Sequence, residues 1–164
     1  MFSQWSWKPV FMVTENHSLT VRKYEAETDR PLINDWWQAR HGAMEDFPAG
    51  LLPPLGCIVE DPLGPCFALW CYEAAGVGVA FIEWPVSRPG MQAVKTVTAF
   101  EKAMDSLIAL AGKCWDPPGD YRVFRANVLP AVYRSIREKG FQREHEHSEG
   151  EYIPVILTLN PDES

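Results

Sequence analysis

The spacing of apolar residues divides the chain into alternating strand and helix segments. Apolar and polar positions alternate within segment 19–28, which predicts a first strand. Asp29 and Pro31 then favour a helix start, and that helix is predicted to end at Gly42. The following segment, 43–54, contains prolines and glycines and is predicted to be a loop or a broken helix.

Three apolar runs follow, 55–61, 66–75 and 77–87, and the short turn segments between them predict an antiparallel meander. Segment 91–113 carries an apolar residue at every third or fourth position, which predicts a long amphipathic helix. Its expected buried residues are Val94, Val97, Phe100, Met104, Leu107 and Ala111.

The last part of the chain predicts a strand over 121–128, a short helix over 129–140 and a final hairpin of 141–147 and 152–159. Because one helix connects strand 77–87 to strand 121–128, these two strands should run parallel. The sequence therefore predicts an α/β (α+β) fold, with a mixed, mostly antiparallel sheet of about six to seven strands and helices on both faces. One domain is expected over 1–164, with 1–18 as an N-terminal arm.

The composition supports a folded domain, because 46% of the 164 residues are hydrophobic. Lys and Arg number 15 against 22 Asp and Glu, and the net charge of −7 argues against nonspecific nucleic-acid binding without excluding a local basic site. No apolar stretch is long enough to span a membrane, and the first residues do not resemble a signal peptide.

The cysteines, Cys57, Cys66, Cys71 and Cys114, form no CxxC pair, which favours reduced structural thiols and a cytoplasmic protein. His145 and His147 share one side of a predicted strand and could in principle bind a metal together. Their acidic neighbours and the lack of an evident third ligand favour a solvated strand face, so no metal site is expected.

Two motifs stand out against this order of elements. The segment WPVSRPGMQA (84–93) precedes the long helix, and NVLPAVYRSIREKGF (127–141) covers the short helix. With the element order, they resemble the GNAT acyltransferase superfamily over residues 19–159, in a divergent form. Segments 51–61 and 83–89 also look like those of small phage-encoded members of that superfamily.

The resemblance implies that strands 77–87 and 121–128 splay apart and that the pantetheine arm of acetyl-CoA, the co-substrate, lies in the gap. It places the pyrophosphate on free amides at the start of the long helix, where the helix dipole favours an anion. Met91 stands where the family has a glycine, and Pro89 lacks an N–H donor. If the loop is shifted by one residue, Gly90 takes the place of that glycine. The expected cofactor-binding residues are Val86, Ser87, Arg88, Gly90, Met91, Gln92, Ala93 and Asn127.

Amine acetylation needs a base, and Glu83 stands in an apolar strand where burial would raise its pKa. The alternative is an exposed or Arg-paired glutamate. His41, at a predicted helix end, is either a proton shuttle or a cation that offsets the helix dipole. The family often has a tyrosine acid four residues before its Gly-Phe; here that position is Ile136, and Tyr133 lies nearly one turn earlier.

The sequence thus predicts an acetyl-CoA-dependent N-acyltransferase with degenerate motifs, in which a small-molecule or protein amine attacks the thioester directly. One alternative is a catalytically inactive interaction or inhibitor protein of the same fold. Another is a phage transferase that modifies nucleic-acid bases. The final hairpin could pair two subunits into a homodimer, and the expected location is the cytoplasm, that of the host if the gene is phage-encoded.

Overall fold

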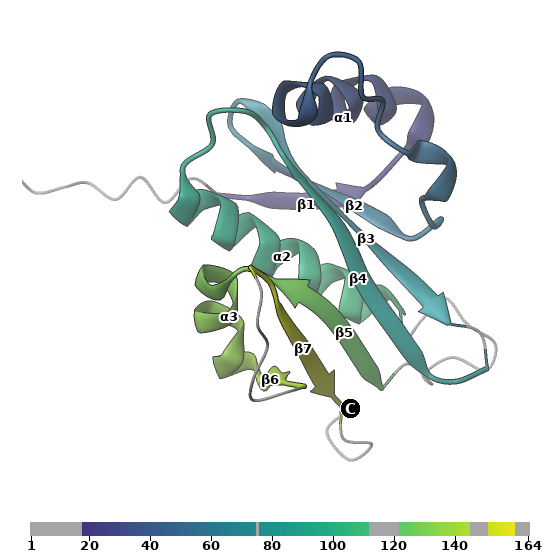
Figure 1. Ribbon diagram of the computed structural model, residues 1–164, viewed down its shortest axis with the longest axis vertical. Coiled ribbons are helices and arrows are strands. Elements are labelled where there is room, and N and C mark those ends of the chain that lie inside the picture. Colours follow the sequence, from purple (N-terminus) through teal and green to yellow (C-terminus); the bar gives the residue numbers. More distant parts are fainter. Residues whose placement is uncertain (1–17, 75, 112–121, 145–150, 160–164) are drawn as a thin grey trace, which may run out of the picture.

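A computed structural model describes residues 18–74, 76–111, 122–144 and 151–159 of the chain (Figure 1). Its strands and helices follow the predicted order. They are β1 (Thr20–Lys23), α1 (Ala26–His41), η1 (Ala49–Leu51), β2 (Gly56–Asp61), β3 (Gly64–Ala74), β4 (Val79–Ser87), α2 (Ala93–Ala111), β5 (Val123–Val128), α3 (Pro130–Ile136), η2 (Arg137–Lys139), β6 (Gln142–Arg143) and β7 (Ile153–Thr158).

The strands form one seven-stranded sheet in the order β1-β2-β3-β4-β5-β7-β6. Strands β4 and β5 run parallel, and the other neighbouring pairs are antiparallel. This pattern confirms the mixed sheet predicted from the single helical crossover between β4 and β5.

Helix α1 covers one face of the sheet, and α2 and α3 cover the opposite face (Figure 1). Side chains of α2, including Phe100, Met104 and Leu107, belong to the larger core cluster with β2, β3, β4, β5 and β7. Ile33 and Trp36 of α1 belong to a second cluster on the other face. The predicted apolar stripe of the long helix was wrong at one position, because Val94 is 79% exposed in the first turn of α2.

The first helix begins three residues before the predicted cap, and β1 is correspondingly short. Asp29 lies inside α1 and is buried, where it accepts two hydrogen bonds of 2.7 Å from Arg22 and one of 2.8 Å from the Glu25 N–H. The Asp29 carboxylate therefore binds an arginine of β1 and does not cap the helix. The helix begins at Ala26, with Glu25 at the N-cap position.

Cys57, Cys66 and Cys71 are buried free thiols, and burial raises the pKa of Cys57 and Cys71 to about 12. Cys114, His145 and His147 lie outside the described residues, as do residues 1–17 of the expected arm. Among the described side chains, no group of His, Cys, Asp and Glu could hold a metal ion. None of the helices in this part of the chain is long and apolar enough to cross a membrane.

Candidate active site

The two parallel strands at the centre of the sheet separate part-way along their length. Their paired residues run from Val79 and Val123 to Ile82 and Ala126, and the pairing stops there. Beyond this point β4 continues beside β3 up to Ser87, whereas β5 continues beside β7. Over residues 83–87, the edge of β4 that faces β5 therefore has no strand partner within the described sheet, and a wedge opens between the two strands.

A β-bulge lies where the wedge begins. Between the pairs Trp70–Glu83 and Ala68–Val86, β3 advances by two residues and β4 by three, so β4 carries the extra residue. Trp84 adopts a φ of 58°, which a bulky side chain rarely does. The extra residue bends β4 and increases its local twist, which accounts for its divergence from β5.

Hydrogen bonds and aromatic packing hold Trp84 in this conformation. Its indole N–H donates to the Tyr72 hydroxyl at 2.8 Å, and that hydroxyl donates to the Leu51 carbonyl at 2.6 Å. The ring of Trp84 also lies 6.0 Å from Trp37 and 6.1 Å from Phe47. The bulge is thus tied both to α1 and to the loop that precedes β2.

Glu83 is the first residue of β4 beyond the last pair with β5. It is half-buried, and burial raises the pKa of its carboxyl group. Within the described residues its side chain has no hydrogen-bond or ion-pair partner. Ala80 and Ile82 point into the core on the side of α2, so the alternation of the strand places Glu83 on the opposite face.

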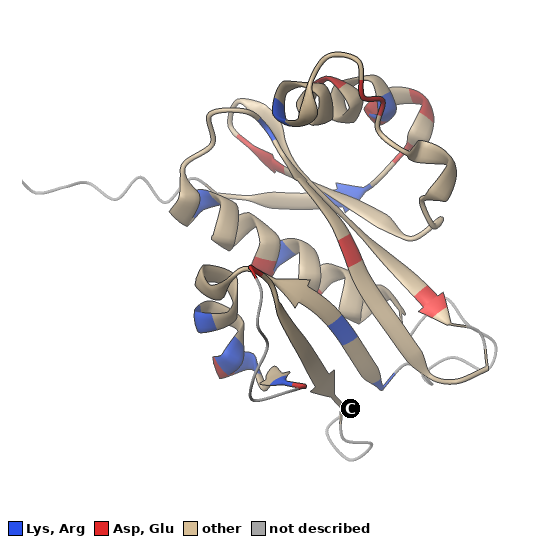
Figure 2. Ribbon diagram, in the orientation of Figure 1, with Lys and Arg blue, Asp and Glu red and all other residues tan. Residues whose placement is uncertain are grey.

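A basic position on β5 pairs with Phe81, two residues before the acidic position on β4 (Figure 2). The basic residue, Arg125, already has a partner: its guanidinium donates to both oxygens of Glu144, at 2.6 and 2.8 Å. It also lies 5.7 Å from the ring centroid of Phe81. Arg125 is thus paired with Glu144, and no described ion pair joins it to Glu83.

The loop after β4 presents free backbone donors at the start of α2. The N–H of Thr96 donates to the Gln92 carbonyl at 2.9 Å, so the amides of residues 93–95 precede the first helical hydrogen bond. The first turn of α2 contains no acidic residue. Gly90 has a φ of 75°, and a Cβ there would meet no atom within 4 Å. This helix start therefore has the amides and the space that an anion requires.

Arg88, the residue expected to bind phosphate, is instead held by hydrogen bonds to residues at the end of β2 and the start of β3. Its guanidinium donates to the two carboxylate oxygens of Asp61 at 2.7 and 3.3 Å and to the Pro65 carbonyl at 3.2 Å. Lys95 donates to the same carboxylate at 2.5 Å. These cations hold the pKa of the buried Asp61 well below its usual range, the Arg88 hydrogen bond being the larger cause.

The other loop residues take varied positions. Val86 and Ser87 are buried at the end of β4, and the Ser87 hydroxyl accepts a hydrogen bond of 3.0 Å from Arg40. Met91 is partly buried and packs against the larger core cluster, so it fills space beneath the loop. Gln92 and Ala93 are exposed.

The remaining predicted residues lie on three different elements around the wedge. Asn127 is exposed on β5, immediately beyond the last pair with β4. The His41 ring ends α1 and stacks on Trp37 with centroids 3.9 Å apart. Tyr133 is partly buried on α3, and the guanidinium of Arg143 lies 4.9 Å from its ring centroid. No described hydrogen bond joins His41, Tyr133 or Asn127 to Glu83.

Solved structures share the overall fold of this chain. A GCN5-related N-acetyltransferase from Kribbella flavida has a TM-score of 0.60 at 16% identity, over 86% of this chain and 98% of that one. The ribosomal-protein-S18-alanine N-acetyltransferase from Escherichia coli has a TM-score of 0.55 at 14% identity, over 87% and 93%. The chain has the GNAT fold.

N-acetylglutamate synthase from Neisseria gonorrhoeae, solved with coenzyme A and L-arginine, shares the GNAT fold with a TM-score of 0.59 at 14% identity. The match covers 87% of this chain but 33% of the synthase, so the chain spans about a third of that protein's length. No protein-family model and no curated sequence matches the chain.

The sequence did not indicate three residues that shape this version of the GNAT fold. Asp61 precedes a turn and is 27 positions from Arg88, so no local pattern links them. Arg40 and Tyr72 likewise contact β4 residues that are distant in sequence. Of the three, Asp61 alone had a visible signal, a carboxylate at the end of an otherwise apolar strand.

Proposed function

We propose that this protein transfers the acetyl group of acetyl-CoA to an amine. The observation that carries the proposal is the wedge between β4 and β5, whose β4 edge over residues 83–87 is unpaired beside free amides at the start of α2. A pantetheine arm contains amides that can pair with such an edge, and a pyrophosphate fits a helix start without acidic residues. The Neisseria neighbour, which was solved with coenzyme A, supports this choice of substrate.

In this proposal, backbone groups do most of the binding of acetyl-CoA. Val86 and Ser87 supply the strand edge, Asn127 lies on the other side of the wedge, and the loop from Gly90 to Ala93 receives the pyrophosphate. Arg88 contributes indirectly, because its hydrogen bonds to Asp61 fix the start of that loop. Arg88 and Lys95 together carry one positive charge more than Asp61, which favours an anion at the start of α2.

The proposed chemistry is a direct transfer. Glu83 takes a proton from the acceptor ammonium, directly or through water, and its raised pKa suits it to that step. The amine nitrogen then forms a bond to the thioester carbonyl carbon and releases its second proton to water, the C–S bond breaks, and the electron pair leaves on the coenzyme A sulfur. Strand-edge N–H groups polarise the carbonyl. We assign Tyr133 as the proton donor to the thiolate and His41 as a proton carrier on the acceptor side.

The acceptor is proposed to be an amine of a small molecule or of a protein. Both classes occur among proteins of this fold, since one neighbour is an N-acetylglutamate synthase and another is named for an alanine of ribosomal protein S18. Glu83 leaves the acceptor side of the wedge acidic, which favours a cationic amine before its deprotonation.

Thermal unfolding with acetyl-CoA tests the proposal, because a ligand at about 100 times its dissociation constant adds about 2.7 kcal/mol to the free energy of unfolding. We expect a clear rise in Tm. Glu83→Gln should keep that rise and lose acetyl transfer to an amine acceptor. Glu73→Gln is the matched control: burial also raises the pKa of Glu73, but this residue lies on β3, and its loss should leave transfer intact.

One observation favours a second candidate, a protein of this fold that binds a partner without catalysis. The Arg88 guanidinium is occupied by Asp61 and Pro65, so it does not face the loop as a free phosphate ligand. An unchanged Tm at millimolar acetyl-CoA would reject acetyl transfer and support this candidate.

A further inference from the structure

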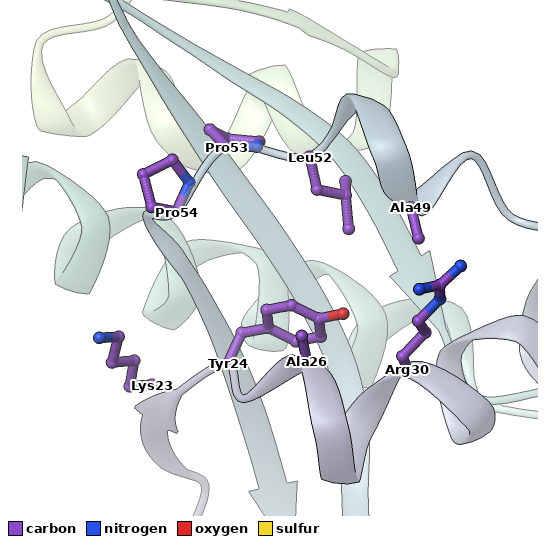
Figure 3. Close-up of a pocket in the computed structure, with 8 residues that line it drawn as sticks. All are labelled: Lys23, Tyr24, Ala26, Arg30, Ala49, Leu52, Pro53 and Pro54. Atoms are coloured by element: carbon purple, nitrogen blue, oxygen red, sulfur yellow. The ribbon is translucent and has the colours of Figure 1, made fainter.

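A cavity of about 320 Å³ lies on the face of the sheet that α1 covers, toward the β1 edge, between the end of β1, the first turns of α1 and the loop before β2. Eight residues line it (Figure 3). They are Lys23, Tyr24, Ala26, Arg30, Ala49, Leu52, Pro53 and Pro54. This volume is at the lower end of the range for small-molecule sites, which suits a ligand of about the size of an aromatic amino acid.

The polar side chains of this cavity, Lys23, Tyr24 and Arg30, can all donate hydrogen bonds. Tyr24 lies between Lys23 and Arg30, and its hydroxyl points toward the side of Arg30 (Figure 3). Tyr24 is 9% exposed as a residue, but its hydroxyl oxygen is open to solvent and has no hydrogen-bond partner among the described residues. Because Tyr24 lines the cavity, this hydroxyl is available to donate a hydrogen bond to a ligand that enters it.

The two cations of the cavity form no ion pair with the carboxylates described nearby. The nearby carboxylates of Asp29 and Glu60 both accept hydrogen bonds from Arg22, at 2.7 Å. Within the described residues, neither Lys23 nor Arg30 has an ion-pair partner. A chain with a net charge of −7 thus places two cations without a described ion-pair partner at one cavity.

The rest of the cavity is apolar, with the side chains of Ala26, Ala49, Leu52, Pro53 and Pro54. Tyr24 is held in place by its ring, which packs edge-on against Trp70 with centroids 5.0 Å apart, and by its N–H, which donates to the Gly56 carbonyl at 3.0 Å. Tyr24 therefore stands at a fixed position beside an apolar wall, as the polar anchor of a small-ligand site does.

We infer that this cavity binds a small organic acid, with the carboxylate on Arg30 and the Tyr24 hydroxyl and an apolar or aromatic body against the prolines. Arg30 can hold a carboxylate with two parallel hydrogen bonds, and Lys23 adds charge at the rim. The site is separate from the wedge. Residues 24, 56, 70 and 83 follow one another across neighbouring strands, so about 14 Å lie between the backbones of Tyr24 and Glu83. The inference does not depend on acetyl transfer.

The experiment is a calorimetric or NMR titration of the full chain with 3-phenylpropionate, using the neutral 3-phenylpropionamide as the matched probe. We expect saturable binding of the acid and at least about tenfold weaker binding of the amide. Arg30→Gln should weaken binding of the acid about tenfold or more, and Tyr24→Phe, which keeps the ring against Trp70, should weaken it about fivefold. Arg134→Gln, an exposed arginine on α3, is the control and should not change the affinity.

Three results would overturn the inference: no saturable binding of the acid, equal affinity for acid and amide, or unchanged affinity in Arg30→Gln. The titration is repeated with saturating coenzyme A, which should leave the affinity for the acid unchanged. Displacement of the acid by coenzyme A would place it in the wedge and reject a separate site. Failure of coenzyme A to bind at all would count against acetyl transfer but would not affect the inference that the cavity binds an organic acid.

Discussion

The buried carboxylate of Asp61 accepts two hydrogen bonds from the Arg88 guanidinium, at 2.7 and 3.3 Å, and so ties the turn after β2 to the loop after β4. Lys95 joins the same carboxylate from the first turn of α2. The side chain of Asp61 has no exposed surface, whereas those of Arg88 and Lys95 are 26% and 27% exposed. One carboxylate therefore sets the position of the loop and helix start that are proposed to bind pyrophosphate.

Replacing this carboxylate should destabilise the protein. Asp61→Asn leaves two partly buried cations without a counter-charge, and we expect a loss of about 2 kcal/mol in the free energy of unfolding, measured by urea denaturation. Asp105→Asn is the control, because the Asp105–Lys139 pair is exposed and should contribute less than about 0.5 kcal/mol. Similar losses in the two variants would contradict the role given to Asp61.

The lowered pKa of Asp61 predicts that the free energy of unfolding depends on pH. The pKa of Asp61 is lower in the folded protein than the value of about 3.9 expected in the unfolded chain, so its contribution is fully present above about pH 4 and is lost as the pH falls toward the folded pKa. Unfolding free energies measured from about pH 5 to about pH 2 should therefore converge for wild type and Asp61→Asn. A difference that stays constant over this range would reject the linkage.

A steric prediction concerns the contact between Gly56 and Trp70. A Cβ at Gly56 would lie 2.4 Å from Cδ1 and Nε1 of the Trp70 ring, and that ring is fully buried and cannot move aside. Gly56→Ala should cost about 2 kcal/mol of stability by overpacking. Gly50→Ala is the matched control, because a Cβ there meets nothing within 4 Å, and it should be close to neutral. The measurement is Tm by calorimetry, and equal shifts would refute the predicted clash.

If Glu83 is the base, transfer should depend on its ionisation. Its pKa is raised by burial, so kcat/KM should rise with pH through a value above the usual glutamate range of about 4.3 and then level off. A pH profile of wild type against Glu83→Gln measures this, since the variant should show only a low residual rate without that rise. A rise that persists unchanged in the variant would assign the ionisation to another group.

The raised pKa of Glu83 also predicts a gain in stability on substitution. A carboxylate whose folded pKa is raised contributes most below its unfolded pKa and destabilises the fold once the pH passes the folded value. Glu83→Gln should therefore be slightly more stable than wild type near neutral pH, by less than about 1 kcal/mol, in urea unfolding. A loss of stability instead would show that the ionised side chain has a partner that holds it in place.

The order of strands and helices could be predicted from the sequence because periodicity is local. The parallel crossover followed from the helix between β4 and β5, and the inward faces of α1 and α2 followed from residues such as Ile33 and Phe100. The start of α1 at Ala26 could not be predicted in the same way. It depends on the hydrogen bonds of Asp29 to Arg22, which join a helix to a strand.

The candidate site could be predicted from the sequence only in part. Glu83 could be located because an acidic residue in an apolar strand is conspicuous, and burial raises its pKa as expected. The occupation of Arg88 by Asp61 and the positive φ of Trp84 could not be foreseen, because both depend on tertiary contacts. The roles assigned to Tyr133, His41 and Asn127 stay predictions.

The central claim is that the wedge between β4 and β5 admits coenzyme A, and amide hydrogen exchange with and without coenzyme A tests it most directly. We predict slower exchange over residues 83–87 of β4 and 90–95 at the start of α2, with a much smaller change in β1 at the far edge of the sheet. Exchange in these two segments that is unchanged by saturating coenzyme A, or that slows no more than in β1, would contradict the account.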